Sequence, residues 1–97
     1  MFDIDFTPEA KEDLKLLRKF EQQEIIDGIQ KQLKHEPTVE TRNRKKLRPN
    51  EVAEWEVRVG RFRVFYNVDE AAGIVIIEAI GFKIGSQLFI RGEMRTL

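Results

Sequence analysis

The sequence of 97 residues contains no cysteine, one histidine and three prolines. The lack of cysteine excludes disulfides, zinc–thiolate sites and cysteine nucleophiles, and it suits a reducing compartment. The longest run of apolar side chains is Ile74–Ile77, whereas a bilayer-spanning helix needs about 20 such residues. The N-terminus also has no basic segment followed by an apolar one. These absences predict a soluble cytoplasmic protein with no membrane partner, and the length of 97 residues fits one domain spanning residues 1–97.

A net charge is also lacking, because 17 basic side chains offset 17 acidic ones. The charges are nevertheless segregated along the chain. Residues 1–40 hold 6 basic and 10 acidic side chains, residues 41–63 hold 8 and 3, and residues 64–97 hold 3 and 4. Because salt limits the reach of each charge to about 8–10 Å, the basic middle segment can attract a polyanion whatever the total charge is.

The first third of the chain is predicted to form a short strand followed by helix. Apolar side chains alternate with aspartates over residues 2–6, and Thr7 followed by Pro8 is typical of a helix N-terminus. Two apolar stripes at helical spacing follow, and Pro37 ends the second one. No Gly or Pro separates the stripes, so one bent helix and a helical hairpin both fit. The residues of the two stripes are Ala10, Leu14 and Leu17, and then Ile25, Ile26, Ile29 and Leu33.

The remainder is predicted to form antiparallel strands. Residues 36–50 are polar and basic and are expected to form a surface connection. Alternating patterns over 54–59 and 61–68 flank a tight turn at Gly60-Arg61, and residues 74–80 are apolar enough for a central strand that ends at Gly81. Residues 88–90 fit a last short strand. Helices followed by strands indicate an α+β fold with the helices on one face of the sheet and the other face open.

The open face is predicted to carry cations. In a hairpin around Gly60, the side chains of Glu56, Arg58, Arg61 and Arg63 share one face, while Trp55 and its apolar neighbours turn toward the helices. Guanidinium groups fixed on strands can bind phosphate and stabilise charge that develops in phosphoryl transfer. Charged side chains on a half-exposed strand also serve solvation alone, and the pattern does not separate these roles.

Three further features have more than one interpretation. The basic loop fits a nucleic-acid backbone contact, and it also fits a solvated loop or a docking patch for an acidic chain. His35 fits a helix C-terminus better than a catalytic base, and Phe65 fits either base stacking or partial burial. No metal site or nucleotide cofactor is predicted, since no ligand spacing or phosphate-binding glycine pattern occurs. The cations of the loop are Arg42, Arg44, Lys45, Lys46 and Arg48.

Several segments together resemble the RelE/ParE superfamily of microbial toxins. The hairpin WEVRVGRFRVFYNVD over residues 55–69 is similar to the family's hairpin, and it lies between Lys46–Arg48 and the strand IEAIGFK over residues 77–83. Residues 6–10 resemble the family's entry into its first helix. The resemblance implies two N-terminal helices packed on one face of a mainly antiparallel four-stranded sheet. It also implies a type II toxin neutralised by a cognate antitoxin.

RelE-like members cut mRNA on the ribosome and so repress translation. The resemblance implies such an endoribonuclease, an mRNA interferase that needs no metal and positions the 2′-OH to attack the adjacent phosphate. By position, Arg63 matches the arginine on the scissile phosphate, Arg58 matches a basic residue on the preceding strand, and Lys83 matches the basic residue after the last glycine. The RNA-binding residues implied beside them are Arg42, Arg44, Lys45, Lys46, Arg48 and Arg61.

The chain departs from the ribonuclease pattern at three positions. Phe89 stands where well-known members have tyrosine, Glu56 where they have lysine, and Phe82 where many have histidine. Glu56 fits a general base or an ion-pair partner of Arg58 or Arg63. Two alternatives therefore stay open beside the endoribonuclease: a ParE-type inhibitor of DNA gyrase, and a catalytically weakened member that only binds its antitoxin and, through it, operator DNA.

Overall fold

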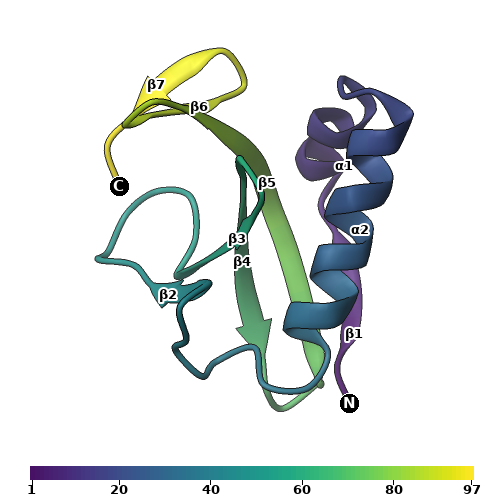
Figure 1. The fold of residues 1–97 in the computed structure, drawn as a ribbon. Coiled ribbons are helices and arrows are strands. Elements are labelled where there is room, and N and C mark those ends of the chain that lie inside the picture. Colours follow the sequence, from purple (N-terminus) through teal and green to yellow (C-terminus); the bar gives the residue numbers. More distant parts are fainter.

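The chain folds into two helices and a curled sheet, as seen in a computed structural model that describes residues 1–97. Figure 1 shows the helices on one side of the sheet and, on the other side, the loop between β2 and β3 and the hairpin of β6 and β7. The nine elements, in chain order, are β1 (Asp3–Phe6), α1 (Pro8–Lys15), α2 (Lys19–Leu33), β2 (Arg44–Lys46), β3 (Trp55–Val59), β4 (Phe62–Asp69), β5 (Ile74–Ile84), β6 (Gln87–Ile90) and β7 (Glu93–Arg95).

The helical segment is a hairpin rather than one bent helix. Thr7 caps α1 through its hydroxyl, which accepts a hydrogen bond from the Ala10 N–H at 3.1 Å, and Pro8 occupies the first turn. The helix ends at Lys15, and α2 begins at Lys19, where the Arg18 N–H donates to Glu21 Oε1 at 3.1 Å. In Figure 1 the chain reverses between them, so that α2 runs back past β1. Side-chain capping by Glu21 therefore starts a new helix without any Gly or Pro.

The sheet has seven strands instead of the four expected. Its order is β2-β3-β4-β5-β6-β7, all antiparallel, and β1 pairs in parallel with the first half of β5. The expectation that Gly81 ends the central strand is wrong, since β5 continues to Ile84 and pairs there with β6. Gly81 belongs in the strand because β6 passes very close: a Cβ atom at this position would lie 2.6 Å from the Phe89 carbonyl oxygen. Part of the predicted surface connection also forms β2, through main-chain pairing with β3.

A large apolar core fills the space between the helices and the sheet. Tyr66 is fully buried there, and its hydroxyl donates a hydrogen bond of 2.7 Å to the Pro37 carbonyl oxygen, just beyond α2. Burial raises the pKa of Tyr66 far above its ordinary value. The core comprises Ala10, Ile25, Ile29, Leu33, Trp55, Val57, Val59, Phe62, Val64, Tyr66, Val75, Ile77 and Ile80.

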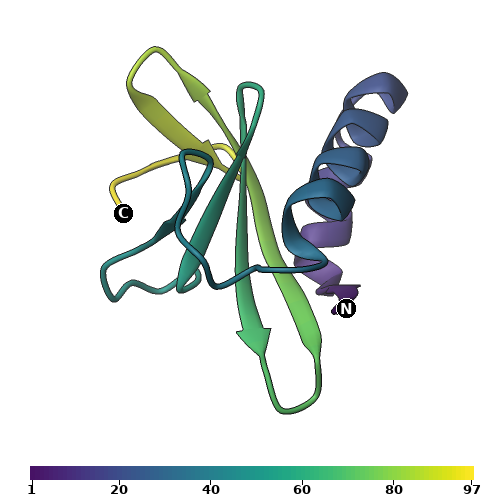
Figure 2. The ribbon, with the colours of Figure 1, turned by 60° about the horizontal axis from the view of Figure 1, so that its bottom comes forward.

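The opposite face of the sheet is not open throughout, because a second, smaller core covers part of it. Phe65 lies in this small core and is 0% exposed, so its ring is not available for stacking on a base. A register shift between Phe65 and Tyr66 in the pairing of β4 with β5 accompanies this packing. Figure 2 shows the hairpin of β6 and β7 and the C-terminal segment folded toward the loop that follows β2. The small core is formed by Ala53, Phe65, Ala79, Leu88 and Ile90, with Leu47, Val52 and Leu97 packed against it.

None of the helices is both long and apolar enough to cross a bilayer.

Candidate functional site

Cations from several strands come together on the sheet face that lies away from the helices. Arg58 on β3 pairs directly with Arg63 on β4, and residues directly opposite each other in an antiparallel pair share a face. Arg63 in turn pairs with Gly81 on β5, two residues before Lys83, and Lys45 on β2 pairs with Glu56 on β3. We call this set the basic face: Lys45, Glu56, Arg58, Arg63 and Lys83. Like charges placed opposite one another lower stability, so the Arg58–Arg63 pair fits a ligand-binding role better than a structural one.

Arg63 is the best-fixed member of the basic face. It is only 8% exposed, and its Nη1 donates to the carbonyl oxygens of Gly60 and Phe62 at 3.1 and 3.0 Å. Burial, with a contribution from Arg58, lowers the pKa of the guanidinium, and Glu56 opposes that shift. Nε and Nη2 make no hydrogen bond within the chain. A preorganised guanidinium with two groups of free donors suits an oxyanion ligand.

Glu56 is the carboxylate beside this arginine. Its Oε2 lies 3.9 Å from Arg63 Nε, and its side chain is 19% exposed. At 3.9 Å the contact is an ion pair and not a hydrogen bond, so both carboxylate oxygens keep free lone pairs. Glu56 is thus placed to accept a proton from a group bound at Arg63. Arg58, on the same strand, is exposed.

Arg61 does not share this face, contrary to the alternation expected for the hairpin. Its Nη2 donates to Glu21 Oε2 on α2 at 2.9 Å, and its guanidinium lies 4.9 and 5.6 Å from the ring centres of Phe62 and Phe82. The hydrogen bond from Arg61 lowers the pKa of Glu21. Strand alternation fails here because Arg61 lies in the tight turn after Gly60, whose φ is 57°.

The positions that carry tyrosine and histidine in relatives also lie off the basic face. Phe82 pairs with both Phe62 and Phe89, and the rings of Phe82 and Phe89 stack with their centres 5.8 Å apart. Because Phe62 belongs to the large core, these rings lie on the helix side of the sheet. Glu56 is therefore the carboxylate that lies beside Arg63 on the basic face, and the two phenylalanine rings lie on the other side of the sheet.

The basic loop divides into exposed cations and one structural arginine. Arg42, Lys45, Lys46 and Arg48 are exposed. Arg44 is partly buried: its Nη1 donates to the Gln32 carbonyl oxygen at 2.6 Å and its Nε to the Val39 carbonyl oxygen at 2.9 Å. It therefore ties the loop to the end of α2.

These contacts predict different results for two neighbouring arginines. Arg44→Gln should lower the free energy of unfolding by about 1–3 kcal/mol, because it leaves the partly buried Gln32 carbonyl group without its charged donor. The matched variant Arg42→Gln should change it by less than about 0.5 kcal/mol. Urea unfolding of both proteins measures the difference, and equal midpoints would show that the Arg44 contacts do not hold the loop.

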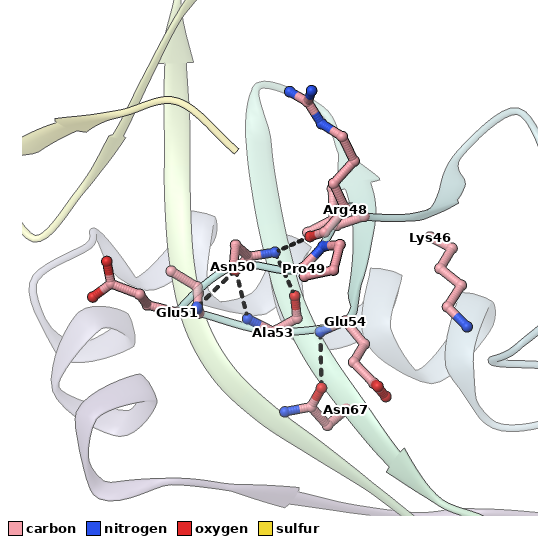
Figure 3. A pocket seen from close by; sticks show the side chains of 10 residues that line it. Lys46, Arg48, Pro49, Asn50, Glu51, Ala53, Glu54 and Asn67 are labelled. Carbon is pink, nitrogen blue, oxygen red and sulfur yellow. Dashed lines mark hydrogen bonds between the residues drawn. The ribbon is translucent and has the colours of Figure 1, made fainter.

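The loop after β2 is shaped by Asn50. Its Oδ1 accepts from the N–H groups of Val52 and Ala53 at 2.7 and 3.1 Å, and its Nδ2 donates to the carbonyl oxygens of Arg48 and Ala53 at 2.8 and 2.9 Å. Figure 3 shows the side chains of Lys46 and Arg48 extending away from this turn. The loop borders an open pocket of about 560 Å³ with both acidic and basic lining residues. The turn fixes the direction in which the chain leaves the exposed cations and enters β3.

An ion pair that the sequence did not reveal joins α1 to the turn between β6 and β7. Asp13 Oδ1 lies 3.0 Å from Arg91 Nε, and Oδ2 accepts from the Ile80 N–H at 3.1 Å. Arg91 Nη2 also donates to the Glu78 carbonyl oxygen at 3.1 Å. Burial raises the pKa of Asp13, and the Ile80 N–H and Arg91 oppose that shift. This network holds the hairpin of β6 and β7 against the rest of the fold.

The raised pKa predicts a pH dependence of stability. The native state binds the Asp13 proton more tightly than the unfolded chain, where the pKa has its ordinary value of 3.8. The contribution of Asp13 to the free energy of unfolding should therefore fall as the pH rises above about 4 and through the native pKa. Urea unfolding of the wild type and of Asp13→Asn over this pH range measures it. The wild type should lose stability relative to the variant as the pH rises, and a relative gain would contradict the direction of the shift.

No group of three or more His, Cys, Asp or Glu side chains is arranged to hold a metal ion.

Comparison with known proteins adds a family and a fold. Residues 4–81 match the family model described as ParE toxin of type II toxin-antitoxin system, parDE. The chain is similar to one in the crystal structure of the toxin-antitoxin complex RelBE2 from Mycobacterium tuberculosis, with a TM-score of 0.72 and 24% identity over 84% of this chain and 98% of that one. A chain in the archaeal RelE-RelB complex from Pyrococcus horikoshii OT3 gives a TM-score of 0.65 and 18% identity over 81% and 91%. No curated protein sequence matches the chain.

Proposed function

Because the chain belongs to the ParE toxin family of the RelE/ParE superfamily, and so is the toxin of a type II toxin–antitoxin system, we propose that it cuts mRNA on the ribosome. The observation that carries the proposal is Arg63, nearly buried on the basic face, with Nε and Nη2 free and Arg58 directly opposite. Two arginines on adjacent strands match the charge of a phosphodiester whose negative charge grows in the transition state.

The proposed reaction needs an internal nucleophile and two proton transfers. The ribose 2′-oxygen forms a bond to the adjacent phosphorus while the bond from phosphorus to the 5′-oxygen breaks, leaving a 2′,3′-cyclic phosphate and a 5′-hydroxyl. Glu56 takes the 2′ proton, and the departing 5′-oxygen receives one from the Lys83 ammonium or from water. Arg63 and Arg58 stabilise the charge on the non-bridging oxygens. The exposed cations Arg42, Lys45, Lys46 and Arg48 contact the RNA backbone around the cleaved bond.

The partners of the proposed function are the ribosome with its mRNA and a cognate antitoxin. Both structural relatives were crystallised as toxin–antitoxin complexes. An antitoxin covering the basic face would block the approach of RNA, and through its own DNA-binding part it could hold the pair on operator DNA.

Expression in a bacterial cell, with and without the neighbouring antitoxin gene, tests the proposal. Induction of the toxin alone should stop growth and produce mRNA 5′ ends in phase with codons, and co-expression of the antitoxin should abolish both effects. Growth arrest without codon-phased mRNA ends would contradict the proposal.

Inhibition of DNA gyrase is the second candidate, and the family model itself favours it, since it describes ParE toxins. The phenylalanines at positions 82 and 89, in place of proton-transferring side chains, point the same way. A gyrase inhibitor should cause cleaved DNA and a DNA-damage response, with mRNA left intact. Mapping DNA breaks and mRNA ends in the same induced culture separates the two candidates.

A further inference from the structure

The last strand brings another arginine to the basic face. Arg95 on β7 pairs directly with Leu88 on β6, and Leu88 pairs directly with Lys83 on β5. Directly paired residues share a face, so Lys83 and Arg95 lie on the same side of the sheet as Arg63. Leu88 belongs to the small core on that side, which agrees with this placement.

Arg95 also contains the one buried side-chain nitrogen or oxygen atom in the chain without a hydrogen-bond partner, its Nε. An unpaired N–H of a charged group in a buried position is costly, and such atoms are rare in folded proteins. Arg95 makes no ion pair with any carboxylate of the chain, in contrast to Arg61, Arg63 and Arg91. Nε itself is too buried for an external ligand to reach. Nη1 and Nη2 make no hydrogen bond within the chain and are not among its buried unpaired atoms, so an external anion can bind the guanidinium through them.

The strand that carries Arg95 is held in place from several directions. The Asp13–Arg91 pair fixes the preceding turn, and Leu88 and Ile90 pack into the small core together with Leu97, which follows Arg95. Gly81 lets β6 approach β5 closely, since any side chain there would strike β6. Arg95 thus lies on a strand that is held by contacts both before and after it.

We infer that Arg95 binds a backbone phosphate of single-stranded RNA, forming with Lys83 a second phosphate site beside the one at Arg63 and Arg58. The inference rests on the proposed function, because it assigns the RNA path over the basic face. On this path the RNA runs away from the cleaved bond, from β4 across β5 and β6 to β7. Arg95 is thus a substrate-positioning residue: it contacts a phosphate that does not react.

The test measures binding of a short 2′-O-methyl RNA oligonucleotide, which lacks the attacking hydroxyl, over a series of salt concentrations. Each phosphate contact on a single strand contributes about 0.7 to the slope of log K against log salt concentration. Arg95→Gln should reduce the slope by about this amount and weaken binding about tenfold at low salt. Arg95→Lys should retain the slope. Lys31→Gln, which removes an exposed cation from α2, is the matched control and should change neither quantity.

The outcomes separate this inference from the proposed function. An unchanged slope for Arg95→Gln, or no binding of the oligonucleotide by the wild type, would overturn the inference. A reduced slope supports it even when programmed ribosomes show no mRNA cleavage, in which case the endonuclease proposal fails and the phosphate site stands. Cleavage by the wild type and by Arg95→Gln at equal rates and equal KM, with equal slopes, leaves the endonuclease and removes Arg95 from its RNA path. Urea midpoints of all four proteins identify any loss of binding that is due to unfolding.

Discussion

Arg63→Ala is expected to slow mRNA cleavage by roughly 10²–10³ on programmed ribosomes. Loss of a preorganised donor to the developing phosphorane charge costs about 2–4 kcal/mol of activation free energy. Arg63 qualifies because it is nearly buried, has free donors at Nε and Nη2, and is held by the carbonyl oxygens of Gly60 and Phe62. The expected loss lies mainly in kcat, since the interaction strengthens as charge develops.

Two controls keep the Arg63 result interpretable. Arg18→Ala removes an exposed arginine at the start of α2, far from the basic face in sequence and on the helix layer, and should leave cleavage unchanged. Because Arg63 is buried, the alanine variant also perturbs packing. Arg63→Lys is the second control, since lysine retains the charge and lacks the planar set of donors. Full toxicity of a folded Arg63→Ala protein, with its urea midpoint near that of the wild type, would exclude the phosphate role.

Glu56→Gln is expected to reduce cleavage by about 10²–10⁴ while RNA binding stays equal or becomes tighter. The amide has nearly the shape of the carboxylate, yet it cannot take the 2′ proton, and general-base catalysis contributes about this factor. The neighbouring Arg63 loses an ion-pair partner at 3.9 Å, which leaves more positive charge for the phosphate. The quantity to measure is the single-turnover rate against pH, beside the affinity for uncleavable RNA.

The pH profile distinguishes a base from a partner that only orients Arg63. Loss of the rising limb of the rate profile in Glu56→Gln identifies Glu56 as the base. A rate within about threefold of the wild type, with an unchanged profile, would mean that Glu56 acts only as an ion-pair partner.

Much of the fold could be predicted because local rules and tertiary structure agree. Thr7-Pro8 starts a helix by capping chemistry that depends on a few neighbouring residues. The strand alternation around Gly60 correctly separates Val57 and Val64, which are fully buried against the helices, from Arg58 on the other face. The family's hairpin motif falls in this same segment, where side-chain periodicity and motif reinforce each other.

The strands missed by sequence reasoning are those whose side chains carry no signal. β2 is Arg-Lys-Lys and forms only because its main chain completes the edge of β3. Gly81 resembles a strand end, and the close approach of β6 that requires glycine there involves residues later in the chain. The small core around Phe65 likewise depends on Leu47, Leu88 and Leu97, which no short-range pattern connects.

In the candidate site, too, some residues could be placed from the local sequence and others depend on contacts with distant parts of the chain. Arg58 and Arg63 were placed together by strand alternation, and Lys83 by family position, and all three lie on one face. Arg61 and Arg44 look equivalent to them in sequence, yet Glu21 holds the first and the carbonyl oxygens of Gln32 and Val39 hold the second. Arg95 was missed because its strand pairs only with β6, which places it near Lys83 in space and 12 residues away in sequence.

The most direct test of the account is the chemistry of the cut ends. Purified toxin is added to ribosomes programmed with a defined mRNA, and the fragment termini are identified. Attack by the 2′-oxygen predicts a 2′,3′-cyclic phosphate on the upstream fragment and a 5′-hydroxyl on the downstream one, with no cleavage when the nucleotide before the cut is 2′-deoxy. Intact mRNA, or downstream fragments with a 5′-phosphate, would contradict the proposed cleavage at the basic face.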